Sequence, residues 1–176
     1  MNLPAATADA PRVYLAGPEV FLPDAEAVLA RKKAICARLG LVAAAPLIDA
    51  PAPAAAEAMK RAFAISAGNE ALIRSCVAVV ANLTPFRGAS ADAGTVYELG
   101  FARGLGLGLY AYTNDPRDYA ARVLDRPDGL DGIAAAGGVF VRASAEAEDV
   151  WRDLGVFETC VRAASRRLTG AAVAPR

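Results

Sequence analysis

The sequence predicts a single-domain α/β protein whose five-stranded parallel sheet is covered by helices on both faces. Five short apolar runs with the character of buried strands alternate with stretches of helical spacing, and this alternation is typical of parallel sheets. The runs are apolar almost without interruption, as expected of strands that are buried on both sides. The length of 176 residues suits one domain with one sizeable core.

Each predicted strand is a short apolar run, and the clearest ones stop at a turn that contains proline. The first, RVYLAG at 12–17, ends at Gly-Pro. The run SCVAVVANL at 75–83 is rich in β-branched residues and stops before Thr84-Pro85. The other three predicted strands lie at 41–46, 107–113 and 137–143.

The predicted helices carry apolar residues three and four positions apart. The first, at 24–40, begins at an aspartate and ends at a glycine. Its basic run RKK at 31–33 is predicted to be a solvent-exposed face. The other predicted helices lie at 56–75, 92–105 and 145–167.

Segments outside these elements are predicted to be loops and tails. The Ala/Pro-rich segment 43–55 follows the second strand, and we expect a loop there, close to the functional site. Residues 1–10 and 169–176 are expected to be terminal tails, which leaves one domain at 11–168.

The composition excludes several classes of site and partner. The chain has no histidine, so Ser–His–Asp triads, Cys–His dyads and His-based zinc sites are excluded. Lys plus Arg equals Asp plus Glu, at 19 each, which argues against the basic surface of a protein that binds a nucleic-acid polymer. The three cysteines are far apart and odd in number, so we expect buried reduced thiols. Neither a signal peptide nor an apolar run of about 20 residues is found, which predicts a cytoplasmic protein outside the membrane.

The predicted topology directs attention to three loops. Ligands of doubly wound sheets bind at the carboxyl ends of the strands. The loops there are AGPEVF after the first strand, NLTPFRGASAD after the third and TNDPRD after the fourth. The stretch SADAGTVYELGFARGLG at 90–106 overlaps the second loop and carries two carboxylates, Asp92 and Glu98.

Two interpretations of each carboxylate stay open at this point. Asp92 precedes a helical stretch and can be a helix N-cap with no other role. Glu98 can be an exposed surface acid, although its neighbours in GTVYELGFA are too apolar and glycine-rich to favour this. We expect Glu98 to point toward the loop after the first strand, near Tyr14. Gly94 and Thr95 would leave room for a ligand at the helix start and offer backbone N–H groups.

Four blocks of the sequence resemble the nucleoside 2-deoxyribosyltransferase family. They are VYLAGPEVFLPDA, GNEALIRSC, VVANLTPFRG and SADAGTVYELGFARGLG, which together span roughly residues 12–112 in the order of the family. The combination of PFRG with Asp-x-Gly-Thr-x-x-Glu-x-Gly is specific. Cytokinin-type phosphoribohydrolases share Gly-Thr-x-x-Glu but carry it after Pro-Gly-Gly, which is missing here. The resemblance implies a flavodoxin-like (Rossmann-like), doubly wound sheet.

The resemblance also implies residue roles. Glu98 matches the family's nucleophile, which attacks C1′ of the deoxyribose and forms a covalent glycosyl-enzyme. Asp92 matches the acid that binds or protonates the departing base, and Tyr14 matches the tyrosine that orients the nucleophile. Asn69 takes the place of an Asp or Asn that contacts the sugar. The implied substrate-binding residues are Gly17, Pro18, Phe21, Asn69, Phe86, Arg87, Gly88 and Thr95.

The activity implied is transfer of 2-deoxyribose between nucleobases, in nucleotide salvage. The partners would be a nucleoside or nucleotide and a free nucleobase, bound by a homodimer or higher homo-oligomer. No metal and no organic cofactor is expected. Arg87, a single arginine in a site loop, raises a further hypothesis: it binds a 5′-phosphate, which would favour nucleotides over nucleosides.

The sequence also departs from the family. LDRPDGLDGIAAAGG stands where members carry a segment whose Asn reaches a neighbouring subunit's site, and Val77 stands where an Asp is common. Two alternatives therefore stay open: an N-glycoside hydrolase of deoxynucleosides or their 5′-monophosphates, and a non-catalytic nucleotide-binding domain.

Overall fold

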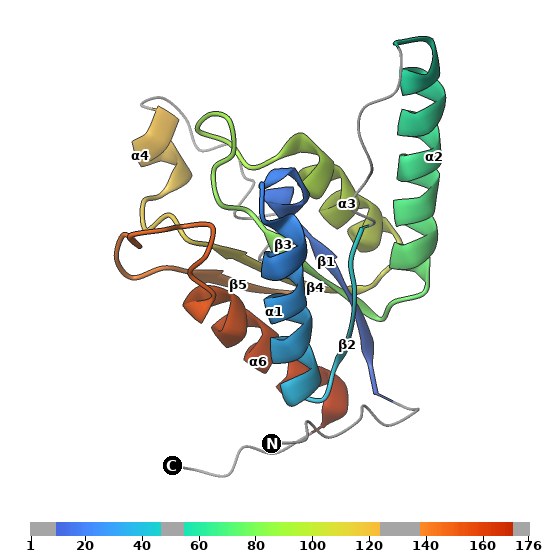
Figure 1. Ribbon diagram of the computed structural model, residues 1–176. Coiled ribbons are helices and arrows are strands. Elements are labelled where there is room, and N and C mark those ends of the chain that lie inside the picture. The colour runs from blue at the N-terminus through green and yellow to red at the C-terminus, as the bar shows by residue number, and fades with distance from the viewer. Residues whose placement is uncertain (1–9, 47–54, 124–137, 171–176) are drawn as a thin grey trace.

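In the computed structural model of the protein, five parallel strands form one sheet in the order β2–β1–β3–β4–β5 (Figure 1). The structure describes residues 10–46, 55–123 and 138–170. Each strand lies within its predicted run, so the predicted sheet is confirmed. The strands are β1 (Arg12–Ala16), β2 (Val42–Ala44), β3 (Ala78–Asn82), β4 (Gly108–Thr113) and β5 (Val139–Arg142).

Helices cover both faces of this sheet. Figure 1 shows α1 and α6 on one side and α2 and α3 on the other. A 3₁₀ helix, η1, follows β1 directly, and a short helix, α4, follows β4. The bounds are η1 (Pro18–Phe21), α1 (Ala25–Arg38), α2 (Ala55–Arg74), α3 (Ala93–Gly104), α4 (Tyr119–Val123) and α6 (Gly155–Thr169).

The two faces bury separate apolar clusters because successive strand residues point to opposite sides of a sheet. On β1, Tyr14 packs with Ile73 of α2 and Leu99 of α3. Its neighbour Val13 packs with Phe157 of α6 on the other face. The apolar runs are therefore buried on both sides, as the sequence predicts.

The strand order creates the crevice in which the site lies. β1 and β3 are paired in parallel, yet the helices that follow them, α1 and α3, lie on opposite faces of the sheet. The loops after β1 and β3 therefore diverge at the carboxyl ends of these strands, and ligands of doubly wound sheets bind at such switch points.

The prediction that the last helix begins at 145 is wrong. Residues 144–154 form bends and turns, and α6 begins at Gly155. The Asp149 side chain accepts hydrogen bonds from the backbone N–H groups of Trp151 and Arg152, and Asp153 accepts one from Gly155. Such local side-chain bonds compete with helical backbone bonds and delay the start of the helix.

The basic run at 31–33 is exposed only in part. Arg31 and Lys33 are exposed, but Lys32 is buried, so the prediction of a fully solvated face is wrong at that position. Cys36, Cys76 and Cys160 are buried and free, as predicted.

Other predictions concern residues that the structure leaves undescribed. Most of the predicted tails, most of the 43–55 loop and the divergent segment before the last strand lie outside the described residues. Among the residues that are described, no helix is long and apolar enough to cross a bilayer, and no group of His, Cys, Asp or Glu side chains is arranged to hold a metal ion.

Candidate active site

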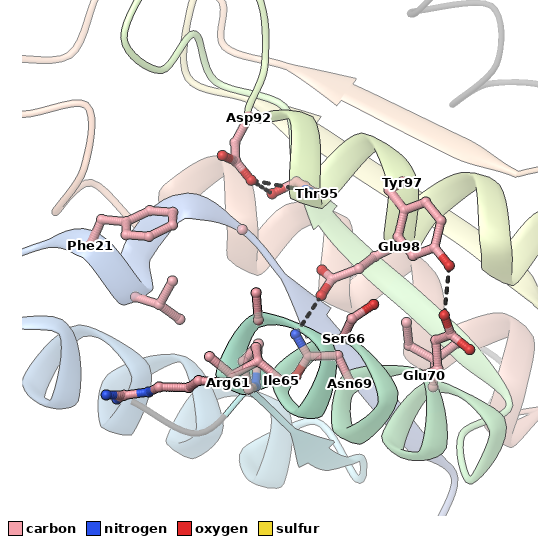
Figure 2. A pocket seen from close by; sticks show the side chains of 16 residues that line it. Phe21, Arg61, Ile65, Ser66, Asn69, Glu70, Asp92, Thr95, Tyr97 and Glu98 are labelled. Atoms are coloured by element: carbon pink, nitrogen blue, oxygen red, sulfur yellow. Dashed lines mark hydrogen bonds between the residues drawn. The ribbon is translucent and has the colours of Figure 1, made fainter. Parts of the chain in front are cut away.

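A cavity of about 680 Å³ opens at the carboxyl ends of β1 and β3 (Figure 2). Its walls come from the β1–η1 segment, α2 and the start of α3. In the view of Figure 2, Phe21 and Glu98 approach it from opposite sides. The lining residues are Gly17, Val20, Phe21, Pro46, Arg61, Ala62, Ile65, Ser66, Asn69, Glu70, Ile73, Asp92, Gly94, Thr95, Tyr97 and Glu98.

Asp92 is both the N-cap of α3 and part of the cavity wall. Its Oδ2 accepts hydrogen bonds from the backbone N–H of Thr95 at 2.9 Å and from Thr95 Oγ1 at 3.0 Å. The capping interpretation is therefore confirmed. The bonds use Oδ2, so Oδ1 is left for a ligand. The Thr95 N–H that was expected to face a ligand binds Asp92 instead.

Glu98 lies on the buried face of α3. Thr95, Leu99 and Ala102 share this face at helical spacing and are buried. Glu98 is 9% exposed, and its carboxylate borders the cavity. The alternative that Glu98 is an exposed surface acid is therefore wrong. Glu98 is an acid at a buried position of α3 where an apolar residue would be expected.

Two donors from different elements hold one oxygen of this carboxylate. The Tyr14 hydroxyl, on β1, donates to Glu98 Oε1 at 2.7 Å, and Asn69 Nδ2, on α2, donates to the same atom at 3.0 Å. Tyr14 is fully buried. Both bonds use Oε1, so Oε2 is available to a ligand in the cavity.

Burial raises the pKa of Glu98 from 4.5 to about 7, because the charged form loses water. The hydrogen bonds from Tyr14 and Asn69 oppose this rise, since they stabilise the carboxylate, while the nearby charge of Asp92 adds to it. The pKa of Tyr14 is raised by its own burial and by Glu98, so it stays a protonated donor.

An aromatic stack supports the Phe21 side of the cavity. Phe21 stacks on Phe86 with ring centroids 5.5 Å apart, and Phe86 meets the edge of Trp151 at 5.8 Å. The Arg87 guanidinium lies over both phenylalanine rings, at 5.0 Å and 4.8 Å. Arg87 has a φ of 55°, and this left-handed backbone forms part of the turn that carries the stack.

The structure brings most of the predicted site residues together. Gly17, Phe21, Asn69, Asp92, Thr95 and Glu98 line the cavity, and Tyr14 contacts Glu98. Besides Tyr14, four predicted residues stand outside the lining: Pro18, Phe86, Arg87 and Gly88.

The contribution of α2 to the cavity, beyond Asn69, was not predicted from the sequence. Besides Asn69, this helix lines the cavity with Ala62, Ile65 and Ser66. These positions are three and four residues apart and share one helical face with Asn69, so they could have been predicted from the position of Asn69. Tyr97 and Glu70 were also missed. They join α3 to α2 by a hydrogen bond of 2.6 Å at the cavity edge.

Comparisons with known proteins agree with this geometry. A family model described as nucleoside 2-deoxyribosyltransferase matches residues 13–161. The structure is similar to a 2-desoxiribosyltransferase from Leishmania mexicana, with a TM-score of 0.58 and 29% identity over 86% of this chain and 97% of that one. It also resembles a conserved protein from Enterococcus faecalis V583, with a TM-score of 0.50 and 20% identity over 76% of this chain and 92% of that one, which shows the fold alone. Curated proteins give no significant match. Since the family model matches most of the chain, the protein belongs to the nucleoside 2-deoxyribosyltransferase family.

Proposed function

We propose that the protein transfers 2-deoxyribose from a 2′-deoxynucleoside to a second nucleobase through a covalent bond between C1′ and Glu98. The observation that carries this proposal is the buried Glu98 carboxylate, held through Oε1 by Tyr14 and Asn69 at the edge of the cavity. Family membership and the named activity of the Leishmania mexicana protein support it.

In the first step, Glu98 Oε2 attacks C1′ of the bound nucleoside. The bond from C1′ to the base nitrogen breaks, and its electron pair stays on the base. Positive charge develops on the sugar in an oxocarbenium-like transition state, which a carboxylate next to C1′ stabilises and then captures. The departing base takes a proton from Asp92, when that side chain is protonated, or from water.

In the second step, a nitrogen of the incoming base attacks C1′ and the Glu98 carboxylate leaves. The proton displaced from the incoming base returns to Asp92 or to solvent. Throughout, Tyr14 and Asn69 hold Oε1, so the attacking oxygen needs no reorientation between the steps. If water attacks in place of the base, the same intermediate is hydrolysed.

A slow 2′-fluoro-2′-deoxynucleoside tests the intermediate. Mass spectrometry should find one sugar adduct per chain, mapped to Glu98. Glu98→Gln should give no adduct, whereas Glu70→Gln, which changes another cavity carboxylate, should keep it. An adduct on a different residue with turnover intact would overturn the assignment.

Products separate the remaining alternatives. A deoxynucleoside incubated with a second free base should give a new nucleoside if the protein is a transferase, and free deoxyribose if it is a hydrolase. A non-catalytic binding domain would release no base at all.

A further inference from the structure

A second buried acid lies behind the cavity wall. Glu19 is 2% exposed and belongs to η1, whose next two residues, Val20 and Phe21, line the cavity. Its partner Tyr112 belongs to the apolar cluster on the α1 and α6 face of the sheet, opposite the face on which Glu98 lies, and its partner Lys32 lies over the Tyr112 ring. Neither catalytic step uses it.

Three elements bind the Glu19 carboxylate. Its Oε1 forms an ion pair with Lys32 of α1, accepts a hydrogen bond from Asn82 Nδ2 of β3 at 2.6 Å, and accepts one from the Tyr112 hydroxyl of β4 at 3.2 Å. Lys32 Nζ also donates to Tyr112 at 2.6 Å and lies over the Phe157 ring. Burial acts to raise the pKa of Glu19, but Lys32 and Asn82 together outweigh it and hold the pKa below its usual value, which favours the ionised acid.

The carboxylate is packed directly against the backbone that lines the cavity. A Cβ added to Gly17 would overlap Glu19 Oε2 and would lie 3.1 Å from the Cβ of Asn82. Gly17 lines the cavity itself. The Glu19 side chain and this part of the wall are therefore in direct contact.

The same network reaches the other loops of the site. Asn82 Oδ1 accepts hydrogen bonds from the Thr84 backbone N–H at 3.0 Å and from Thr84 Oγ1 at 2.6 Å. Thr84 Oγ1 in turn accepts one from the backbone N–H of Asn114 at 3.0 Å. The loops after β1, β3 and β4 are thus joined through one set of buried polar groups.

Stability alone is a weak explanation for this arrangement. Replacing a buried ion pair with uncharged residues of similar volume is often neutral or stabilising, whereas removing one partner is strongly destabilising. We propose that Glu19 is a positioning residue, whose buried carboxylate, paired with Lys32, holds η1 where Val20 and Phe21 form the substrate-facing wall.

The test compares Glu19→Gln, Lys32→Met and the double variant. Each single variant leaves one buried charge unpaired and should lower the Tm. The double variant removes both charges and should regain a Tm close to that of the wild type. It should nevertheless raise KM for the nucleoside about tenfold while kcat changes less than threefold, because the groups around Glu98 come from other elements.

A second readout does not depend on activity. Trp151 is the single tryptophan, and it contacts Phe86, which stacks on Phe21 of η1. Displacement of η1 in the double variant should increase acrylamide quenching of Trp151 about twofold. Ile35→Ala, in the same core cluster, is the matched control: it should lower the Tm without changing KM or quenching.

The kinetic readout rests on the proposed function, and the fluorescence readout does not. If the wild type cleaves no nucleoside, the proposed function fails and quenching alone decides the positioning role. The inference would be overturned if the double variant had the same KM and the same Trp151 quenching as the wild type. It would also be overturned if Ile35→Ala changed KM and quenching as much as the double variant does. If the double variant does not fold, Tyr112→Phe decides, since it removes only one hydroxyl. It should raise KM two- to threefold, and an unchanged KM would refute the inference.

Discussion

Glu98 occupies a position where catalysis and stability oppose each other. Its folded pKa of about 7 lies above the ordinary value of 4.5, so the folded protein holds this proton more tightly than the unfolded chain. The free energy of unfolding should therefore fall as the pH rises from about 4.5 to about 7, and then level off. At about 1.4 kcal/mol per pKa unit, the ionised acid costs roughly 3 kcal/mol.

Glu98→Gln should reveal this cost. The amide oxygen can still accept from Tyr14 and Asn69 but carries no charge. We expect cleavage of the glycosidic bond to fall at least about 10³-fold, while the Tm at pH 8 rises by several degrees. Calorimetry at pH 5 and pH 8 measures this difference in Tm between Glu98→Gln and the wild type, which should nearly vanish at pH 5. A lower Tm at both pH values would contradict it.

The pH dependence of cleavage should follow the same carboxyl. The nucleophile must be ionised, so kcat/KM should rise with pH, reach half its maximum near pH 7 and level off above that. Tyr14→Phe removes a donor that stabilises the carboxylate, and this limb should then move to higher pH. Pre-steady-state or initial-rate profiles from pH 5 to 9 measure the shift. An unmoved limb would mean that another group controls it.

The phosphate-binding role of Arg87 stays a prediction, and the structure offers a second role for this side chain. Its position in a site loop suggested a 5′-phosphate ligand, but the guanidinium lies over Phe21 and Phe86. Arg87→Ala should therefore raise KM for a nucleoside and for its 5′-monophosphate by similar factors, about two- to fivefold. A loss confined to the monophosphate would support the phosphate hypothesis instead.

At the level of the elements, Asp92 combines a cap with a candidate acid, and two substitutions separate these roles. Asparagine is a good N-cap, so Asp92→Asn should leave the Tm nearly unchanged while it lowers kcat, because the amide cannot deliver a carboxyl proton. Asp92→Ala should cost about 1 kcal/mol of stability as well. Thermal unfolding measures the stability of the two variants, and initial rates measure their kcat. Equal activity in Asp92→Asn and the wild type would limit Asp92 to capping.

The strands and the long helices could be predicted because their patterns are local. Continuous apolar runs marked every strand, and the motif after the third strand located Asp92 at the N-cap of α3 and Glu98 within this helix. The late start of α6 could not be predicted in the same way, because helical spacing continued through 145–154 and the turn bonds of Asp149 and Asp153 decided the outcome. Helical spacing therefore predicts that a helix is present more reliably than it predicts where the helix begins and ends.

Tertiary partners explain the rest of what the sequence did not show. Lys32 is part of a basic run, and its burial is tolerated because Glu19 of the preceding η1 and Tyr112 of the distant β4 bind its ammonium group. Asn69 could be matched to the family, but its bond to Glu98 depends on how α2 packs beside α3. Such contacts join residues far apart in the sequence and leave no local pattern.

On the scale of the whole molecule, the functional groups come from β1, α2 and α3, so the site forms only when both helices are docked on the sheet. Figure 1 shows that the N-terminal part of α2 extends beyond the sheet. There Phe63 is 69% exposed and Ile65, on the cavity edge, is 43% exposed. The helix α6 buries its apolar residues Phe157 and Val161 in the chain's own core.

The homo-oligomer expected from the family resemblance should therefore use α2. A second copy that covers Phe63 would remove an exposed aromatic side chain from water, which favours association. Light scattering coupled to size-exclusion chromatography should give a multiple of 18.1 kDa for the wild type. Phe63→Glu should shift the mass toward one chain, whereas Ala30→Glu, at an exposed position of α1, should not. If Phe63→Glu keeps the oligomeric mass of the wild type, the interface lies elsewhere. If the wild type itself is monomeric, there is no homo-oligomer, and Glu98 and its partners must work within one chain.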